Sequence, residues 1–198
     1  MLEKLAPLLL FVLVAAITPG GATTLATASG ARFGYRRSVP LIAGIAGGLV
    51  TLASASAIGL ASLMLAVPSL QMAMKLIGTV YLLWLAWKIG RSGPPNMTAD
   101  LARPTGFIGS ACLLWLNPKA WAMTLGAAAS FAAVASDPWH LAVLLGGAFG
   151  LAGTLSMSLW CLAGFILARL LRTTRQWRVL NITLALLLAA SILPMWLE

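Results

Sequence analysis

Long uncharged stretches separated by short basic segments are the main pattern of this sequence. No charged residue occurs in residues 5–31, and none occurs in residues 38–74. A helix needs about 20 mainly apolar residues to cross the hydrocarbon core of a bilayer. The first stretch therefore predicts one membrane-spanning helix. The second predicts two, joined by a short turn at Pro68 and Ser69.

The complete pattern predicts an all-α integral membrane protein with a single transmembrane domain covering residues 1–198. Six transmembrane helices are expected, at about residues 5–29, 39–67, 70–89, 105–131, 139–168 and 179–197. Glycine, proline and asparagine mark the irregular segments between them. We expect a loop at residues 30–37, a polar loop at 91–104, and a turn at Ser136-Asp137-Pro138.

Composition excludes a soluble protein. Apolar residues make up 61% of the chain and charged residues only 9%, whereas about a quarter of the residues of a soluble domain are charged. The first apolar stretch is also too long for the core of a cleaved signal peptide, and no small-residue cleavage site precedes a soluble domain. We interpret residues 5–29 as a retained helix.

The basic residues predict an orientation. The net charge is +9, and the loops after the first, third and fifth helices carry three, three and four basic residues. In a six-helix arrangement these loops all lie on one side, which the positive-inside rule places in the cytoplasm. Both termini are therefore expected to be extracytoplasmic. The basic loops are expected to contact anionic lipid headgroups rather than nucleic acid.

Few residues could support enzymatic chemistry. The chain has one histidine and four acidic residues, and none of them form a cluster with zinc-ligand spacing. No nucleophile is predicted to lie beside a base at one depth of the membrane. Cys112 and Cys161 lie inside apolar segments, where thiols usually act as small apolar side chains. We predict no enzyme activity, no metal and no cofactor.

Two prolines divide the chain into similar halves. Pro19 and Pro118 are 99 positions apart, and each interrupts the first long apolar segment of its half. Broken helices at matching places in two halves are typical of secondary transporters with inverted repeats. We therefore predict half-repeats at about 1–99 and 100–198, with the first and fourth helices broken. Gly47-Gly48 and Gly146-Gly147 repeat the same spacing within GxxxG patterns, which favour close helix packing.

The first break predicts one part of a binding site. Pro19 cannot donate a backbone hydrogen bond, so it should free a carbonyl near Ala15. Such groups are tolerated at membrane depth only where protein or a water-filled cavity satisfies them. Thr18, Pro19, Gly20 and Gly21 are candidate substrate-binding residues. A proline kink that serves only helix packing is the alternative.

The second break adds polar side chains to the predicted site. Asn117, Pro118 and Lys119 lie near the middle of the fourth helix, where a buried ammonium costs several kcal/mol. No acidic residue lies inside a predicted span to pair with Lys119. We predict that Asn117 and Lys119 bind substrate and that Lys119 is the candidate for proton coupling. The alternative is a structural lysine held by backbone carbonyls. Tyr81 is a further candidate, although one hydrogen bond in the core would also satisfy its hydroxyl.

These residues resemble the LysE/RhtB family of bacterial amino-acid exporters. The matching pieces occur in family order over about two thirds of the chain: Thr18-Pro19-Gly20, then Gly30, Arg32, Gly34, Gly44 and Gly48, then Lys75, Gly78, Tyr81 and Leu82, and finally Asn117-Pro118-Lys119. The resemblance implies an exporter of amino acids or related small solutes in the bacterial cytoplasmic (inner) membrane, driven by the proton gradient. Gly21-Ala22 replaces the family's usual Pro-Asn, which indicates a different or less polar substrate.

The function predicted from the sequence is export of a small amino compound. A small-solute channel or facilitator is one alternative, because proline breaks and glycines also shape pores. A membrane scaffold that transports nothing is the other, and it requires Lys119 to be dispensable. The sequence leaves open the solute, the coupling ion and whether the protein forms a homodimer.

Overall fold

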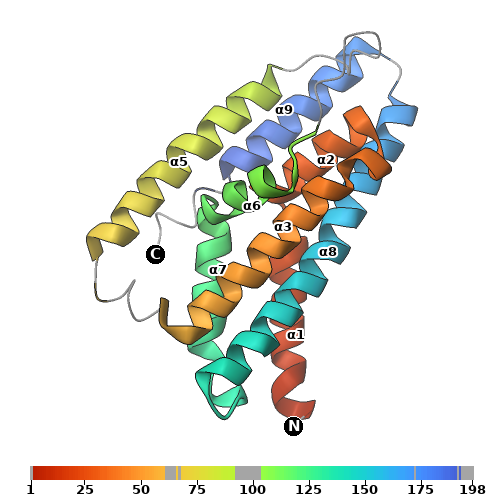
Figure 1. Ribbon diagram of the computed structural model, residues 1–198. Coiled ribbons are helices and arrows are strands. Elements are labelled where there is room, and N and C mark those ends of the chain that lie inside the picture. Colours follow the sequence, from red (N-terminus) through yellow and green to blue (C-terminus); the bar gives the residue numbers. More distant parts are fainter. Residues whose placement is uncertain are drawn as a thin grey trace.

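The computed structural model describes residues 2–60, 66, 68–91, 104–171, 173–190 and 192, and they form a helical bundle (Figure 1). The helices, in chain order, are α1 (Leu2–Ile17), α2 (Gly21–Phe33), α3 (Tyr35–Ala55), η1 (Ser56–Leu60), α5 (Pro68–Gly90), α6 (Phe107–Trp115), α7 (Pro118–Ser130), η2 (Ala132–Val134), α8 (Pro138–Leu170) and α9 (Thr174–Ala190). No strand occurs within these ranges. The prediction of an all-α protein is confirmed there.

Two of the described helices are long and apolar enough to cross a membrane alone. They are Tyr35–Gly59, which joins α3 to most of η1, and Pro138–Leu170, which is α8. The pair Leu5–Ile17 and Gly21–Phe33, bent by 55°, would make a third span. The described part of the chain thus contains two or three spans by this measure, and the full set of six stays a prediction.

The predicted loop at residues 30–37 is wrong in extent. Helix α2 continues through Phe33 and α3 begins at Tyr35, so Gly34 alone separates them. Gly34 has φ of +76°, a conformation that costs glycine little and other residues more. Its amide also donates to the Gly30 carbonyl at 3.0 Å. A single glycine therefore turns the chain, and the basic residues predicted for a loop lie on exposed helix ends.

The main core lies where α3 and α8 pack against each other and α2 packs against α8 (Figure 1). Phe149 and Leu145 of α8 and Leu52 of α3 are fully buried there. A Cβ atom on Gly30 would lie 1.9 Å from the carbonyl oxygen of Cys161. One on Gly164 would lie 2.0 Å from the carbonyl oxygen of Thr27. The backbones of α2 and α8 are therefore in contact, which only glycine permits.

The predicted GxxxG segments do bring helices together, but not as symmetric partners. Gly44 of α3 faces the backbone of α6, and Gly48 faces Leu114 of α6. Gly146 and Gly150 of α8 instead face α3. Gly147, which the spacing paired with Gly48, has open space where a Cβ atom would lie. The matching glycine positions therefore do not pack equivalently.

Helices α5 and α9 form a second packed pair (Figure 1). Ala86 and Ile89 of α5 make a small apolar cluster with Leu184 of α9 and Ile192. This pair is separate from the core cluster formed by α1, α2, α3, α6, α7 and α8. The two helix breaks of the predicted site lie between helices that contribute to the main core, whereas Tyr81 lies on α5.

Candidate functional site

Both predicted helix breaks are present. Helix α1 ends at Ile17 and α2 begins at Gly21, while α6 ends at Trp115 and α7 begins at Pro118. The two prolines differ in local role, however. Pro19 precedes Gly20, the N-cap of α2, whereas Pro118 is itself the first residue of α7. Equal spacing in sequence therefore does not give the prolines equal structural positions.

Asn117 and Pro118 start a helix. Asn117 is 6% exposed, and its Oδ1 atom accepts a hydrogen bond from the backbone amide of Lys119 at 3.1 Å. Asparagine is a preferred N-cap residue, and proline suits the first helical position because its missing amide hydrogen would have had no partner there. The Asn-Pro pair thus has a structural role that its residue types alone could have predicted.

The carbonyl groups at the carboxyl end of α1 accept hydrogen bonds from distant side chains. Two donors come from α8: Ser156 Oγ donates to the Ala16 carbonyl at 2.8 Å, and Trp160 Nε1 donates to the Ile17 carbonyl at 3.1 Å. The third donor, Lys119 Nζ of α7, donates to the Thr18 carbonyl just beyond the helix. A carbonyl left without a partner at membrane depth costs several kcal/mol. These side chains therefore allow the helix to end inside the bundle, one to three residues beyond the carbonyl predicted near Ala15.

The end of α6 is satisfied in a similar way. Trp121 Nε1, on α7, donates to the carbonyl oxygen of Trp115 at 2.6 Å. At each break, the helix before the break ends at a residue, Ile17 or Trp115, whose carbonyl accepts a hydrogen bond from an indole. Sequence reasoning did not find Trp121, Trp160 or Ser156. The available signal was a polar or indole donor inside a long apolar segment, where it needs a partner.

The threonine hydroxyls near the first break mainly satisfy their own chain. Thr23 Oγ1 accepts from the Gly20 amide at 2.7 Å and donates to the Gly20 carbonyl at 2.9 Å. Thr18 Oγ1 donates to the carbonyl oxygen of Val14 at 2.6 Å. Thr18 therefore offers its backbone carbonyl, rather than its hydroxyl, to groups outside its own segment.

Four of the predicted site residues line one small cavity. Gly20 and Gly21 come from the first break, and Asn117 and Lys119 from the second. The cavity has a volume of about 20 Å³, enough for about one water molecule. Its other walls come from small, apolar or hydroxyl side chains: Ala15, Ala16, Ala22, Thr23, Ile45, Leu49, Leu114, Ala120, Met123 and Met157. Lys119 is the one charged residue among those that line the cavity.

Two elements that attract anions adjoin the cavity. Helix α2 begins at Gly21, beside the cavity, and the amino end of a helix carries a partial positive charge with unpaired amide groups. Lys119 adds its amine from α7. In the described ranges the one ion pair joins His140 to Asp137, so no carboxylate pairs with Lys119 there. A carboxylate is the chemical group that such a site suits best.

Four predicted residues are not placed on the cavity. The backbone carbonyl of Thr18 accepts from Lys119, but Thr18 is not among the residues that line the cavity. Pro19 and Pro118 shape the two breaks without lining it. The side chain of Tyr81 lies outside what the structure describes, so its predicted role stays a prediction.

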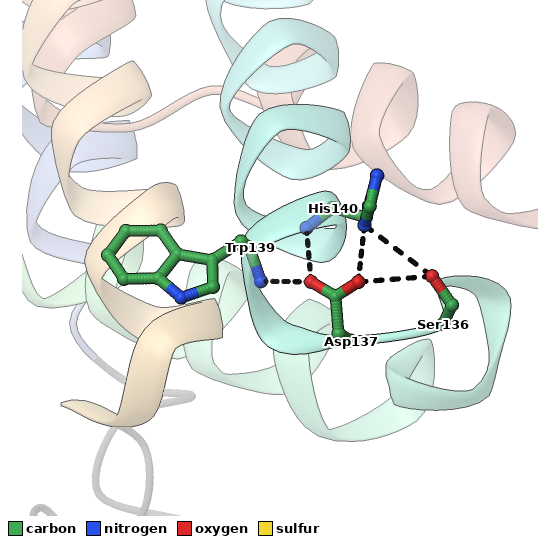
Figure 2. A network of polar contacts seen from close by, with 4 residues as sticks. All are labelled: Ser136, Asp137, Trp139 and His140. Carbon is green, nitrogen blue, oxygen red and sulfur yellow. Dashed lines mark hydrogen bonds and ion pairs between the residues drawn. The ribbon is translucent and has the colours of Figure 1, made fainter.

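A second polar group lies at the start of α8 (Figure 2). The carboxylate of Asp137 accepts from the amides of Trp139 at 2.9 Å and His140 at 3.0 Å, and it also contacts His140 Nδ1. The backbone hydrogen bond from His140, followed by its side-chain contact, lowers the pKa of Asp137 to about 2. The predicted turn at Ser136-Asp137-Pro138 is confirmed, and Asp137 acts as a helix cap.

Comparison with known proteins gives a consistent result. The sequence profile of the LysE type translocators matches residues 13–191. A cysteine/O-acetylserine efflux protein of Salmonella typhimurium (strain LT2) is 32% identical over 179 residues, covering 90% of each chain. The protein of that name from Escherichia coli (strain K12) is similar to the same extent. No solved structure matches.

Proposed function

This chain belongs to the LysE type translocator family, and we propose that it exports cysteine, O-acetylserine or a similarly small amino acid. Family membership makes it a membrane transporter rather than an enzyme. The substrate proposal starts from relatives that are named for the efflux of these two compounds. It then depends on the chemistry of the cavity between the two helix breaks.

The observation that carries the proposal is that both breaks contribute to one cavity with one charged side chain. In that cavity the α-carboxylate of an amino acid would pair with Lys119 and with the amino end of α2. The two elements come from opposite halves of the chain, as the central site of a repeat transporter requires. Thr18, Gly20, Gly21, Asn117 and Lys119 are the proposed binding residues.

The remaining walls support a small substrate with an uncharged side chain. Met123, Met157 and Leu114 line the cavity, and thioether and aliphatic groups accept a thiol or an acetyl group without a charge partner. No carboxylate is available among the lining residues for a basic substrate side chain. Gly21 and Ala22, which replace the usual Pro-Asn of similar exporters, both lie on this wall. The substitution therefore falls where it would alter the substrate.

The size of the cavity supports a transporter that opens and closes. A volume of about 20 Å³ leaves no room for an amino acid, so we propose that this conformation is closed around the site. Substrate would enter only after the halves move apart, as in alternating access. A channel with a permanently open path does not fit a site of this size.

We further propose that export is coupled to proton entry through Lys119. Proton coupling normally uses a carboxylate or histidine inside the membrane, and none lines this cavity. Moving one charge through 100 mV provides about 2.3 kcal/mol, or roughly fiftyfold accumulation. The test is efflux of labelled cysteine from preloaded proteoliposomes with an imposed pH gradient. Efflux that ignores both the gradient and the membrane potential would indicate a facilitator and exclude coupling.

The proposed setting is the bacterial inner membrane, with six spans and both termini outside. Arg32, Arg36 and Arg37 are exposed near the α2–α3 junction, and Arg169 lies near the end of α8. Exposed basic residues at such helix ends suit contact with anionic headgroups on the cytoplasmic side.

Retention in cells tests the substrate directly. Bacteria that lack their own cysteine exporters would be loaded with cysteine or O-acetylserine, with and without this protein. We expect faster appearance of at least one compound in the medium when the protein is present. Equal retention of both, with the protein detected in the membrane, would contradict the proposed function.

A further inference from the structure

The three carbonyl groups at the end of α1 differ in how easily their partners can leave. Ser156 is 2% exposed, and its short side chain cannot carry the hydroxyl away from Ala16 unless α8 moves. Trp160 donates to the Ile17 carbonyl from a rigid indole ring. Lys119, by contrast, reaches Thr18 through a flexible four-carbon side chain that starts on another broken helix. Thr18 is therefore the carbonyl whose partner can move without moving a helix.

The side chain of Lys119 also occupies the space beside the cavity. A Cβ atom placed on Gly20 would lie 3.0 Å from its Cδ atom and 3.5 Å from Nζ. The lysine thus crosses closely over the backbone at Gly20 on its way to Thr18. Together with the small volume of the adjoining cavity, about 20 Å³, this arrangement means that a ligand in the cavity must displace the lysine before it can approach Thr18.

We infer that the Thr18 carbonyl is the subsite for the amino group of the substrate, and that Lys119 fills it as a tethered amine in the closed state. The inference deepens the proposed function and rests on it. Unwound carbonyls at the carboxyl end of a half-helix attract cations, and the amino group of an amino acid is a cation of the same chemistry as the lysine head. A bound amino acid would take the Thr18 carbonyl, and the released Lys119 would pair with its carboxylate.

Displacement of Lys119 from Thr18 favours ligands that carry both an amino group and a carboxylate. An amino acid displaces Lys119 from one hydrogen bond and gives it another, so the lysine loses little. An amine without a carboxylate displaces Lys119 and offers nothing in return. Cysteamine, which is cysteine without its carboxylate, should therefore bind the wild-type protein weakly. It should bind more tightly once the competing lysine is removed.

The experiment is calorimetric titration of cysteamine and of cysteine into purified protein in lipid nanodiscs. Lys119→Met removes the competing amine with little change in side-chain length. We expect it to bind cysteamine about tenfold more tightly than wild type, because one charge-assisted hydrogen bond no longer has to be broken. It should bind cysteine more weakly than wild type does. Lys119→Arg is the matched control, because it keeps a cationic donor that can reach Thr18, and it should bind cysteamine as weakly as wild type.

A second variant keeps the inference testable if Lys119→Met does not fold. Gly20→Ala places a methyl group against the lysine side chain and should loosen its hold on Thr18, so cysteamine should also bind this protein more tightly. Unchanged or weaker cysteamine binding in every folded variant would overturn the inference. Wild-type protein that binds neither cysteine nor O-acetylserine would instead contradict the proposed function, whatever cysteamine does.

Discussion

Lys119 and Asp137 are the two charged residues with the best-defined partners in the described helices. Lys119 donates to a backbone carbonyl in the break between α1 and α2, 101 positions away in sequence. Asp137 accepts from backbone amides only two and three positions away. The first contact therefore depends on how the bundle is packed, whereas the second is local. The two residues should respond differently to substitution.

Asp137 should give the protein an acid-sensitive component of stability. Its pKa is lowered from 3.8 to about 2 in the folded protein, so its ionised form stabilises the fold. That contribution is complete above about pH 4 and is lost as the pH falls towards about 2. Asp137→Asn keeps a good helix cap but removes the charge. We expect the melting temperature of the wild type to exceed that of Asp137→Asn at neutral pH.

Thermal unfolding of both proteins in detergent, followed by circular dichroism from pH 7 down to pH 2, checks this prediction. The difference in melting temperature should shrink over the acidic part of the range. A difference that stays constant would show that the carboxylate charge contributes nothing.

The helices are held in place by close backbone contacts and by side chains that donate hydrogen bonds to the carbonyl groups at the helix breaks. The contact of α2 with α8 fixes α2 in the core, and α2 in turn presents Gly20 and Gly21 to the cavity. Ser156 and Trp160 then connect α8 to the last carbonyls of α1. Helix α8 is thus attached to both halves of the broken first helix, and it should move with them.

Gly164→Ala should be strongly destabilising. The new Cβ would lie 2.0 Å from the backbone oxygen of Thr27, and neither backbone can shift without separating α2 from α8. Overpacking of this kind costs about 1–3 kcal/mol or more. Gly147→Ala on the same helix is the control, because nothing lies within 4 Å of its Cβ position. It should be neutral or slightly stabilising, since alanine favours helices.

The measurement is the fraction of each protein that stays folded in increasing concentrations of SDS. If Gly164→Ala were as stable as Gly147→Ala, the close approach of α2 and α8 would not exist.

The sequence allowed the helices and both breaks to be predicted, because apolar length and proline act locally. Asn117 as a helix cap was equally accessible, since an N-cap residue followed by proline needs no tertiary information. The contact between Lys119 and Thr18 was not predictable, because it depends on how the halves pack. The turn at Gly34 was missed for another reason: one glycine with positive φ replaced a whole loop, and φ cannot be read from composition.

At the scale of the whole molecule, the helix contacts agree with the proposed inverted repeat. Helix α3 packs on α8 and α5 on α9, while α1 contacts α8 and α6 contacts α3 (Figure 1). These are the pairs that a twofold relation between the halves would require. Helices α2 and α7 both have 13 residues. The unequal packing of the glycine pairs shows where the halves differ.

Orientation tests this arrangement. If the two halves are inverted, each has an odd number of spans and both termini are extracytoplasmic. A reporter that is active only in the cytoplasm should give a signal when it is inserted after Asn96 and none when it is fused after Glu198. The reverse pattern would overturn the orientation and the inverted repeat together.

Efflux from proteoliposomes tests the central role of Lys119 most directly. Wild type and Lys119→Met would be reconstituted at equal density with labelled cysteine or O-acetylserine inside, after thermal unfolding has confirmed that both are folded. We predict saturable efflux for wild type and a decrease of at least about tenfold for Lys119→Met, because the substrate carboxylate loses its charged partner. Efflux at the wild-type rate from folded Lys119→Met protein would contradict the proposed site.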